Sequence, residues 1–168
     1  MLYLDVDGVL NPDEPSPGFT EHRVGRLTVR LSPEHGAWLR ELAGRLDLVW
    51  ATTWEEHANQ YIGSRLGLPE LPHVDFSGYE PEPGDPRVPL LQLPRMRKWA
   101  PILRHADGRS FAWVDDVIPF TVRRQALRHR RAVRLVRVDA ARGLTRRQVD
   151  GLWRWAGRRR GRGRVGAF

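Results

Sequence analysis

The chain has 168 residues and a formal net charge of +8, from 28 Lys and Arg against 20 Asp and Glu. This length suits one domain with its own core and is too short for two ordinary domains. The absence of cysteine excludes disulfide frameworks, thiolate nucleophiles and zinc–thiolate sites. Apolar residues make up 40% of the chain, but no apolar run approaches the roughly 20 residues that span a bilayer. An acidic segment appears by Asp5, where a secretory leader would be basic and then apolar, so we expect a cytoplasmic protein without membrane contact.

The charge is unevenly distributed along the chain. Residues 123–168 contain 16 Arg and 2 Asp, whereas residues 1–122 contain 12 Lys and Arg against 18 Asp and Glu. A basic C-terminal region attracts polyanions such as nucleic acid, because arginine neutralises phosphates. The alternative is a coding bias, since GC-rich coding favours Arg, Ala, Gly and Pro together. Both interpretations stay open at this point.

The N-terminal part of the chain combines strand, loop and helix signals. The apolar segment 1–6 predicts a short strand that ends in the turn signal Asp7-Gly8. Three prolines in 11–18 predict a loop, and the loose alternation over 24–31 predicts a small hairpin. Ser32-Pro33 predicts the start of a helix, with serine as the N-cap and proline at the first helical position.

Strand and helix signals continue to alternate through the rest of the chain. The apolar runs 47–51, 111–114 and 133–138 predict strands, and helices are expected over 52–66, 97–106 and 121–130 and after Thr145. Residues 67–94 are rich in Pro and Gly and predict little regular structure beyond a short strand near Val74. This alternation predicts an α/β domain with a parallel sheet covered by helices on both faces, spanning residues 1–157. The Arg/Gly-rich tail 158–168 is expected to be disordered.

Three groups of polar residues follow the ends of predicted strands. These groups are Asp5-Val6-Asp7-Gly8, Thr52-Thr53 and Asp115-Asp116. Each alone has an ordinary structural explanation, since Asp-Gly is a common turn and the other two pairs can cap helices. Ligands of open α/β sheets bind at the carboxyl ends of the strands, however, so three such groups predict one shared pocket.

These motifs resemble those of the haloacid dehalogenase superfamily of phosphohydrolases. Leu4-Asp5-Val6-Asp7-Gly8-Val9-Leu10 is similar to the family's first motif, and Val49-Trp50-Ala51-Thr52 to its second. Lys98 stands where a third-motif lysine is expected, and Phe111-Ala112-Trp113-Val114-Asp115-Asp116 is similar to the fourth motif. The resemblance implies a three-layer Rossmann-like parallel sheet, with the first-motif strand between the strands of the second and fourth motifs. It also implies a small flap over 11–31 and no cap domain.

The resemblance further implies a magnesium-dependent phosphoric monoester hydrolase. Asp5 would be the nucleophile that forms an aspartyl-phosphate, and Asp7 the general acid and base. Mg²⁺ would offset the repulsion between an anionic nucleophile and an anionic ester. The metal ligands would be the Asp5 carboxylate, the Asp7 backbone carbonyl and Asp115, with Asp116 nearby.

The phosphoryl group would be held by Thr52, Thr53 and Lys98, and the N-terminus of a helix beginning at Thr52 would add backbone donors. Arg95 and Arg97 compete with Lys98 for this role. Trp54 and His57 follow Thr52 closely and could line the mouth of the site. Trp54 could equally pack on the sheet. The six histidines lack the spacing of metal ligands.

The substrate and the reaction class have alternatives. A site without a cap admits both small phosphate monoesters and polynucleotide ends, and the Trp50-Ala51-Thr52-Thr53-Trp54 segment is faintly similar to nucleic-acid-repair phosphatases. Asp7 favours a phosphatase over a dehalogenase, but a phosphotransferase or mutase would use the same nucleophile. A nucleic-acid-binding module with an inactive acidic cluster is the third alternative.

Overall fold

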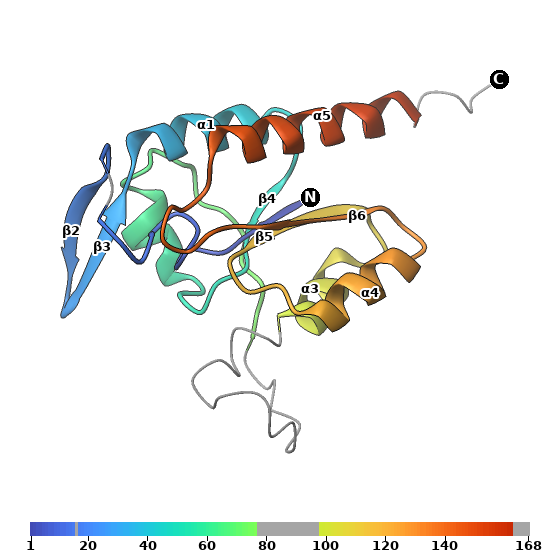
Figure 1. The fold of residues 1–168 in the computed structure, drawn as a ribbon, viewed down its shortest axis with the longest axis horizontal. Helices are drawn as coiled ribbons and strands as arrows, with labels where there is room; N and C mark the ends of the chain where they lie inside the picture. The colour runs from blue at the N-terminus through green and yellow to red at the C-terminus, as the bar shows by residue number, and fades with distance from the viewer. Residues whose placement is uncertain (16, 77–97, 163–168) are drawn as a thin grey trace, which may run out of the picture.

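The computed structural model describes residues 1–15, 17–76 and 98–162. Its main sheet contains β1 (Leu2–Leu4), β4 (Leu48–Trp50), β5 (Phe111–Asp115) and β6 (Val133–Arg137). These strands are parallel and lie in the order β4-β1-β5-β6 (Figure 1). The predicted α/β class is therefore confirmed, and so is the position of the first-motif strand between the other two motif strands.

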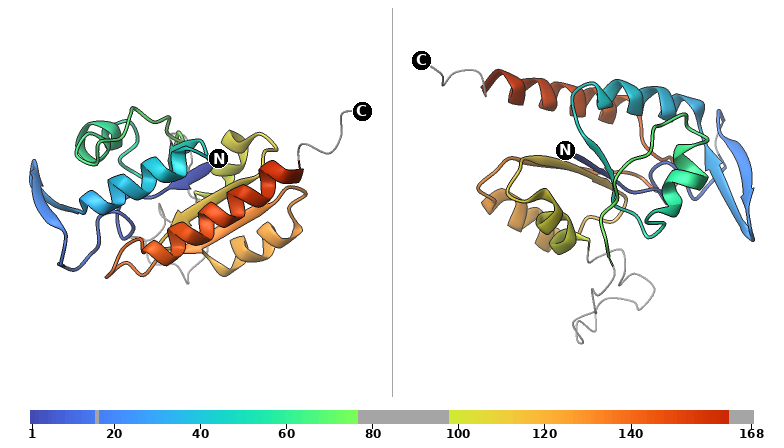
Figure 2. Two further views of the ribbon diagram at one scale, coloured as in Figure 1. Left: turned by 90° about the horizontal axis from the view of Figure 1, so that it is seen from above. Right: turned by 180° about the vertical axis from the view of Figure 1, so that it is seen from behind.

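Helices cover both faces of this sheet. Helices α1 (Pro33–Ala43) and α5 (Arg146–Arg162) lie side by side on one face, and α3 (Trp99–Ala106) and α4 (Phe120–Arg128) lie on the other (Figure 2). Helix α1 begins as its sequence predicts, because the Ser32 hydroxyl accepts a hydrogen bond from Glu34 N. The result is a three-layer arrangement of helices, sheet and helices.

The alternation of side chains along the strands builds a core on each side of the sheet. Leu2 and Leu4 of β1 pack in the cluster that also contains Leu39 of α1 and Leu152 of α5. Tyr3, between them, points to the opposite cluster, which includes Ile102 of α3. All three β1 residues are fully buried, so the strand that carries Asp5 is fixed by packing on both faces.

A small hairpin extends from the edge of the domain. Strands β2 (Thr20–Val24) and β3 (Leu27–Leu31) pair antiparallel, four residues earlier along the chain than the predicted start. The hairpin is the flap that the segment 11–31 predicts. Within the described residues no cap domain is present; most of the predicted proline-rich insertion lies in 77–97, outside them.

The predicted helix over 52–66 is wrong in its first half. The chain forms turns from Thr53 to Glu56, and helical structure includes the π-helical segment Asn59–Gly63. Glu55 has a φ of 47°, in the left-handed region, and this interrupts any α-helix starting at Thr52. The expected helix N-terminus at Thr52 is therefore not formed.

The C-terminal helix is longer than the sequence predicts. Helix α5 continues to Arg162, so the predicted domain boundary after residue 157 falls inside it, and residues 163–168 lie outside the described part. Thr145 precedes this helix, and its hydroxyl and backbone N–H both donate to Gln148 Oε1. Among the described helices, none has both the length and the apolar character needed to cross a membrane.

Candidate active site

Three buried carboxyl groups meet at the carboxyl ends of β1 and β5. Asp5 directly follows β1, Asp115 ends β5, and Asp116 comes next. Each offers an oxygen, and these oxygens all lie within 4.8 Å of one another. Val6 N donates to Asp5 Oδ1 at 2.8 Å, and Val117 N donates to Asp115 Oδ1 at 2.8 Å. The backbone therefore holds one oxygen of each of these two groups.

Lys98 lies between two of these carboxyl groups. Its Nζ is 2.6 Å from Asp5 Oδ2 and 2.8 Å from Asp115 Oδ2, and the side chain is 1% exposed. Lys98 is also the single lysine of the sequence. One ammonium group balances only one carboxylate, so the pair that it contacts carries an excess negative charge when both carboxyl groups are ionised.

Burial determines how these groups hold their protons. Burial raises the pKa of Asp115 to about 7; Lys98 opposes this rise and Asp5 adds to it. Burial alone would lower the pKa of Lys98, but the two adjacent carboxylates outweigh it and raise the pKa. Lys98 therefore stays charged at neutral pH, whereas Asp115 titrates near neutrality.

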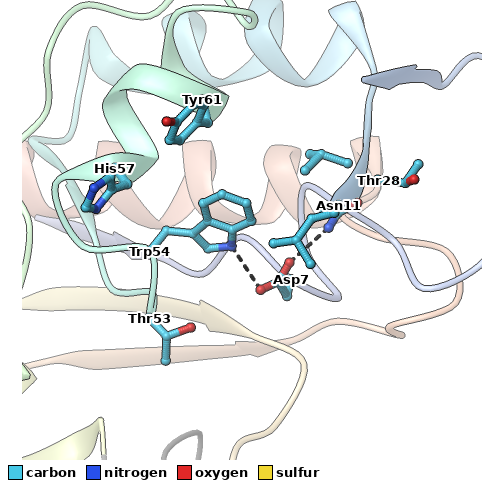
Figure 3. Close-up of a pocket in the computed structure, with 9 residues that line it drawn as sticks. Asp7, Asn11, Thr28, Thr53, Trp54, His57 and Tyr61 are labelled. Atoms are coloured by element: carbon cyan, nitrogen blue, oxygen red, sulfur yellow. Dashed lines mark hydrogen bonds between the residues drawn. The ribbon is translucent and has the colours of Figure 1, made fainter. Parts of the chain in front are cut away.

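The carboxylate of Asp7 points to a different place. Asn11 Nδ2 donates to Asp7 Oδ1 at 2.9 Å, and Trp54 Nε1 donates to Asp7 Oδ2 at 3.0 Å (Figure 3). The turn between Asp7 and Asn11 is closed by Gly8 N, which donates to Asn11 O at 2.8 Å. Asp7 is thus held at the edge of the site, outside the cluster of the other three carboxyl groups.

Asp7 lines an open pocket of about 480 Å³. One wall comes from the hairpin and contains Leu27, Thr28 and Val29. The opposite wall comes from the segment after β4 and contains Thr53, Trp54, His57 and Tyr61 (Figure 3). Asn11, from the loop that carries Asp7, also lines the pocket.

A comparison with protein-family models matches residues 1–149 to a family described as the HAD domain in Swiss Army Knife RNA repair proteins. The match covers most of the chain. The chain belongs to this family. A search of curated proteins and a search of solved structures each found no match. The resemblance to the haloacid dehalogenase superfamily is thereby confirmed, and the HAD domain identifies a phosphoryl-transfer enzyme of the HAD type.

The HAD domain brings together part of the predicted site. Asp5, Asp115, Asp116 and Lys98 form one cluster, in which one oxygen from each of the three aspartates lies within 4.8 Å of the others. Thr52 follows β4 at the same edge of the sheet and is buried, with its hydroxyl 3.5 Å from Trp54 N. Thr53 lines the pocket beside Asp7 instead. Arg95 and Arg97, the alternatives to Lys98, lie outside the described residues.

The sequence does not single out two of the residues that line the pocket of this HAD domain, Asn11 and Tyr61. Tyr61 follows Trp54 by seven residues and His57 by four, a spacing that would place the three rings on one side of a continuous helix. The apolar pattern of this segment indicates only a core residue at position 61. The spacing together with the polar Thr53 and His57 could have indicated a pocket wall.

The donor set of the HAD domain fits a hard divalent cation. Carboxylate oxygens are the preferred protein ligands of Mg²⁺, and Asp5, Asp115 and Asp116 offer three within reach of one another. The excess negative charge beside Lys98 favours a cation further. These residues are the ones that could hold a metal ion.

Gly8 provides a test of this geometry. Its φ is 72°, and a Cβ there would come within 2.7 Å of Asp116 Cγ. We expect Gly8→Ala to lower the free energy of unfolding by roughly 1–2 kcal/mol, because alanine is strained in the left-handed region. The added Cβ should also displace Asp116 and so weaken Mg²⁺ binding. Gly25→Ala is the matched control, because Gly25 has a φ of 59° but nothing within 4 Å of its Cβ. Urea unfolding measures the stability of each variant, and calorimetry measures its affinity for Mg²⁺. If Gly8 only shapes the backbone, both quantities should change equally in Gly8→Ala and Gly25→Ala.

Lys98 should stabilise the metal-free HAD domain. We expect Lys98→Met to lower the free energy of unfolding by about 3–5 kcal/mol at neutral pH, because it leaves two buried carboxylates without their cation. The loss should shrink at pH 5, where the carboxyl groups take up protons, and Mg²⁺ should restore more stability to the variant than to the wild type. Denaturant unfolding at neutral pH, at pH 5 and with added Mg²⁺ measures these three effects. Arg26→Met, at an exposed position, is the control. A loss independent of pH and Mg²⁺ would mean that Lys98 acts only by filling space.

Proposed function

We propose that this HAD domain is a magnesium-dependent phosphatase that releases phosphate from a monoester at an RNA end, through an aspartyl-phosphate on Asp5. The observation that carries the proposal is the buried cluster of Asp5, Asp115 and Asp116, with Lys98 between the first two and a separate carboxylate, Asp7, two residues from the nucleophile. Two carboxylates in different surroundings can take different roles in one reaction.

In the first step, an oxygen of Asp5 attacks the phosphorus atom, and the bond between phosphorus and the ester oxygen breaks. The Lys98 ammonium group, 2.6 Å from Asp5 Oδ2, would offset the charge of the incoming phosphoryl oxygens. Asp7 donates a proton to the departing ester oxygen, which leaves as an alcohol. Phosphoryl transfer depends mainly on positioning and charge neutralisation, and both are available at this cluster.

In the second step, Asp7 has lost its proton and accepts one from a water molecule. The resulting hydroxide attacks the phosphorus atom, the bond from phosphorus to Asp5 breaks, and inorganic phosphate is released. Asn11 and Trp54 hold the Asp7 carboxylate through both of its oxygens. They keep it oriented while it changes from acid to base.

Magnesium, held by the carboxylates of Asp5 and Asp115 and the backbone carbonyl of Asp7 with Asp116 nearby, would supply the charge neutralisation that lets an anionic nucleophile approach an anionic ester. Thr52 and Thr53 are proposed to donate hydrogen bonds to the phosphoryl group. Thr52 is buried at the end of β4 and Thr53 lines the adjoining pocket.

An RNA end is the substrate class that two observations support. The matching family is named for RNA repair proteins, and helix α4 begins four residues after Asp116 and exposes Arg123, Arg124 and Arg128. Such arginines bind a phosphate backbone without regard to sequence. We propose that the basic C-terminal region contacts nucleic acid at least through this helix.

The test is phosphate release from oligoribonucleotides with a 5′- or 3′-terminal phosphate, beside an aryl phosphate, across Mg²⁺ and salt concentrations. We expect phosphate release to require Mg²⁺. We also expect KM for RNA to rise steeply between about 50 and 200 mM salt, because salt weakens binding that depends on contacts between arginines and phosphates. Replacing the three α4 arginines with Gln should flatten this salt dependence, whereas Arg104→Gln on α3 should not.

Two outcomes would contradict the proposal. Salt-independent KM for RNA would mean that the arginines reflect composition alone. Transfer of phosphate to an added alcohol in preference to water would assign a phosphotransferase with the same nucleophile.

A further inference from the structure

We infer that the pocket beside Asp7 is a binding site for the base of the nucleotide that carries the phosphate, with His57 as a stacking surface. The inference rests on the proposed function and adds to it a subsite and the residues that form it. It starts from the position of Asp7, which reaches the pocket from the same loop as the nucleophile.

The geometry of the reaction assigns the pocket to the leaving group. The phosphoryl group must sit at Asp5, whereas the acid must reach the oxygen on the departing side. Asp7 is turned away from the Asp5 cluster and toward the pocket by its hydrogen bonds with Asn11 and Trp54. Whatever is attached to the departing oxygen therefore lies in or against this pocket.

The lining of the pocket selects a flat, uncharged group. Among the described residues that line it, none is Lys or Arg, and Asp7 is the only one with a formal charge at neutral pH when histidine is neutral. A second phosphate would find no cation there. A volume of about 480 Å³ lies within the range of small-molecule sites, which is roughly 300–1,000 Å³.

The aromatic wall has the form of a stacking surface. The rings of His57 and Tyr61 are nearly parallel, with an interplanar angle of 4° and centroids 6.2 Å apart, and Trp54 meets Tyr61 at an angle of 60°. Trp54 and Tyr61 also pack on the core, which explains their presence structurally. The His57 side chain is 59% exposed, so packing in the core does not explain why an aromatic ring stands at this position.

Polar groups complete the fit to a nucleoside. Asn11, Thr28 and Thr53 line the same pocket and can bond ribose hydroxyls or the edge of a base. Base stacking on aromatic side chains, combined with few polar contacts, is how proteins bind single-stranded RNA with little sequence preference. The pocket is open to solvent, so the rest of an RNA strand can extend out of it while the terminal base stays bound.

The test compares two RNAs that carry the same terminal phosphate and differ only in whether the terminal nucleotide has its base. We expect kcat/KM of the wild type to fall by roughly 5- to 150-fold when the base is missing, as one stacked base is worth about 1–3 kcal/mol. His57→Ala should narrow the difference between the two RNAs, and His57→Phe should restore it. His129→Ala is the matched control, because His129 lies against Phe111, at the opposite end of β5 from Asp115.

Equal kcat/KM for the two RNAs, or a difference that His57→Ala leaves unchanged, would overturn the inference while the phosphatase proposal stands. Absence of Mg²⁺-dependent phosphate release from every substrate would instead overturn the proposed function. In that case fluorescence anisotropy of the two RNAs after removal of the terminal phosphate still decides the inference. Tighter binding of the RNA with its base, lost in His57→Ala, supports the subsite, and equal binding rejects it.

Discussion

Replacement of Asp5 by Asn should abolish hydrolysis of every phosphate monoester, whatever its leaving group. An amide oxygen is a poor nucleophile and cannot form the aspartyl-phosphate, so the rate should fall on the order of 10⁴-fold or more; removing a nucleophile elsewhere costs up to about 10⁶-fold. Steady-state phosphate release, with an aryl phosphate and an alkyl phosphate in parallel, measures the loss.

The fold should survive this change. The amide oxygen that replaces the carboxylate can still accept the hydrogen bond from Val6 N, and Lys98 keeps Asp115 as its partner. The variant then has one ammonium group facing one carboxylate, a better charge balance than in the wild type without metal. Thermal unfolding should therefore show a cooperative transition without a large loss. Asp13→Asn, on an exposed loop position, is the matched control and should keep full activity. Turnover by Asp5→Asn at even a hundredth of the wild-type rate would exclude Asp5 as the nucleophile.

Much of the active cluster could be predicted because local pattern determines it. Short apolar runs bounded by Asp-Gly or Asp-Asp indicate buried parallel strands, and parallel strands deliver their terminal residues to one edge of the sheet. This is why Asp5 and Asp115, 110 positions apart in sequence, could be expected to meet. Lys98 could be anticipated only through the resemblance, because its family motif uses lysine, whereas charge alone does not separate Lys98 from Arg95 and Arg97.

The surroundings of Asp7 could not be predicted in the same way. Thr52 to Glu55 has the pattern of a capping box, which predicts a helix, yet Glu55 takes a left-handed φ of 47° and the segment turns instead. The turn brings the Trp54 indole to Asp7, 47 positions earlier in the chain. Side-chain contacts of this kind are set by tertiary packing, and local propensity carries no information about them.

The pocket illustrates the same limit. Its two walls come from a hairpin and from a turn-and-helix segment that are joined by α1 and β4. Sequence patterns predict the hairpin itself, because alternation is local. They do not predict that Thr28 and Tyr61 line one pocket from different sides (Figure 3), since that depends on how the hairpin leaves the edge of the domain.

Replacement of Asp7 by Asn should also impair hydrolysis severely, but by an amount that depends on the leaving group. An alkyl phosphate needs a proton on its departing oxygen, so its first step should slow by about 10²–10⁴-fold. An aryl phosphate departs with little protonation, so the enzyme should still be phosphorylated. The second step then lacks its base, and the phosphoenzyme should accumulate.

Asp7→Asn should also lower the stability of the fold slightly. Both Asp7 oxygens accept hydrogen bonds, from Asn11 Nδ2 and from Trp54 Nε1, and an asparagine at position 7 has only one oxygen to offer. Asn11 cannot turn its own amide without loss, because its Oδ1 accepts from Arg30 N at 2.8 Å. We expect a loss of about 1 kcal/mol in the free energy of unfolding, too little to explain the loss of turnover.

Mass spectrometry of Asp7→Asn after mixing with an aryl phosphate provides the measurement. We expect one added phosphoryl group, mapped to Asp5, that persists in the variant and does not accumulate in the wild type. Asp5→Asn under the same conditions should carry none, and the wild-type pattern should be kept by Asp13→Asn. A label on Asp7 or on a histidine would reverse the assigned roles. Equal slowing for aryl and alkyl substrates would show that Asp7 positions the substrate and does not transfer the proton, because only a proton donor distinguishes between leaving groups.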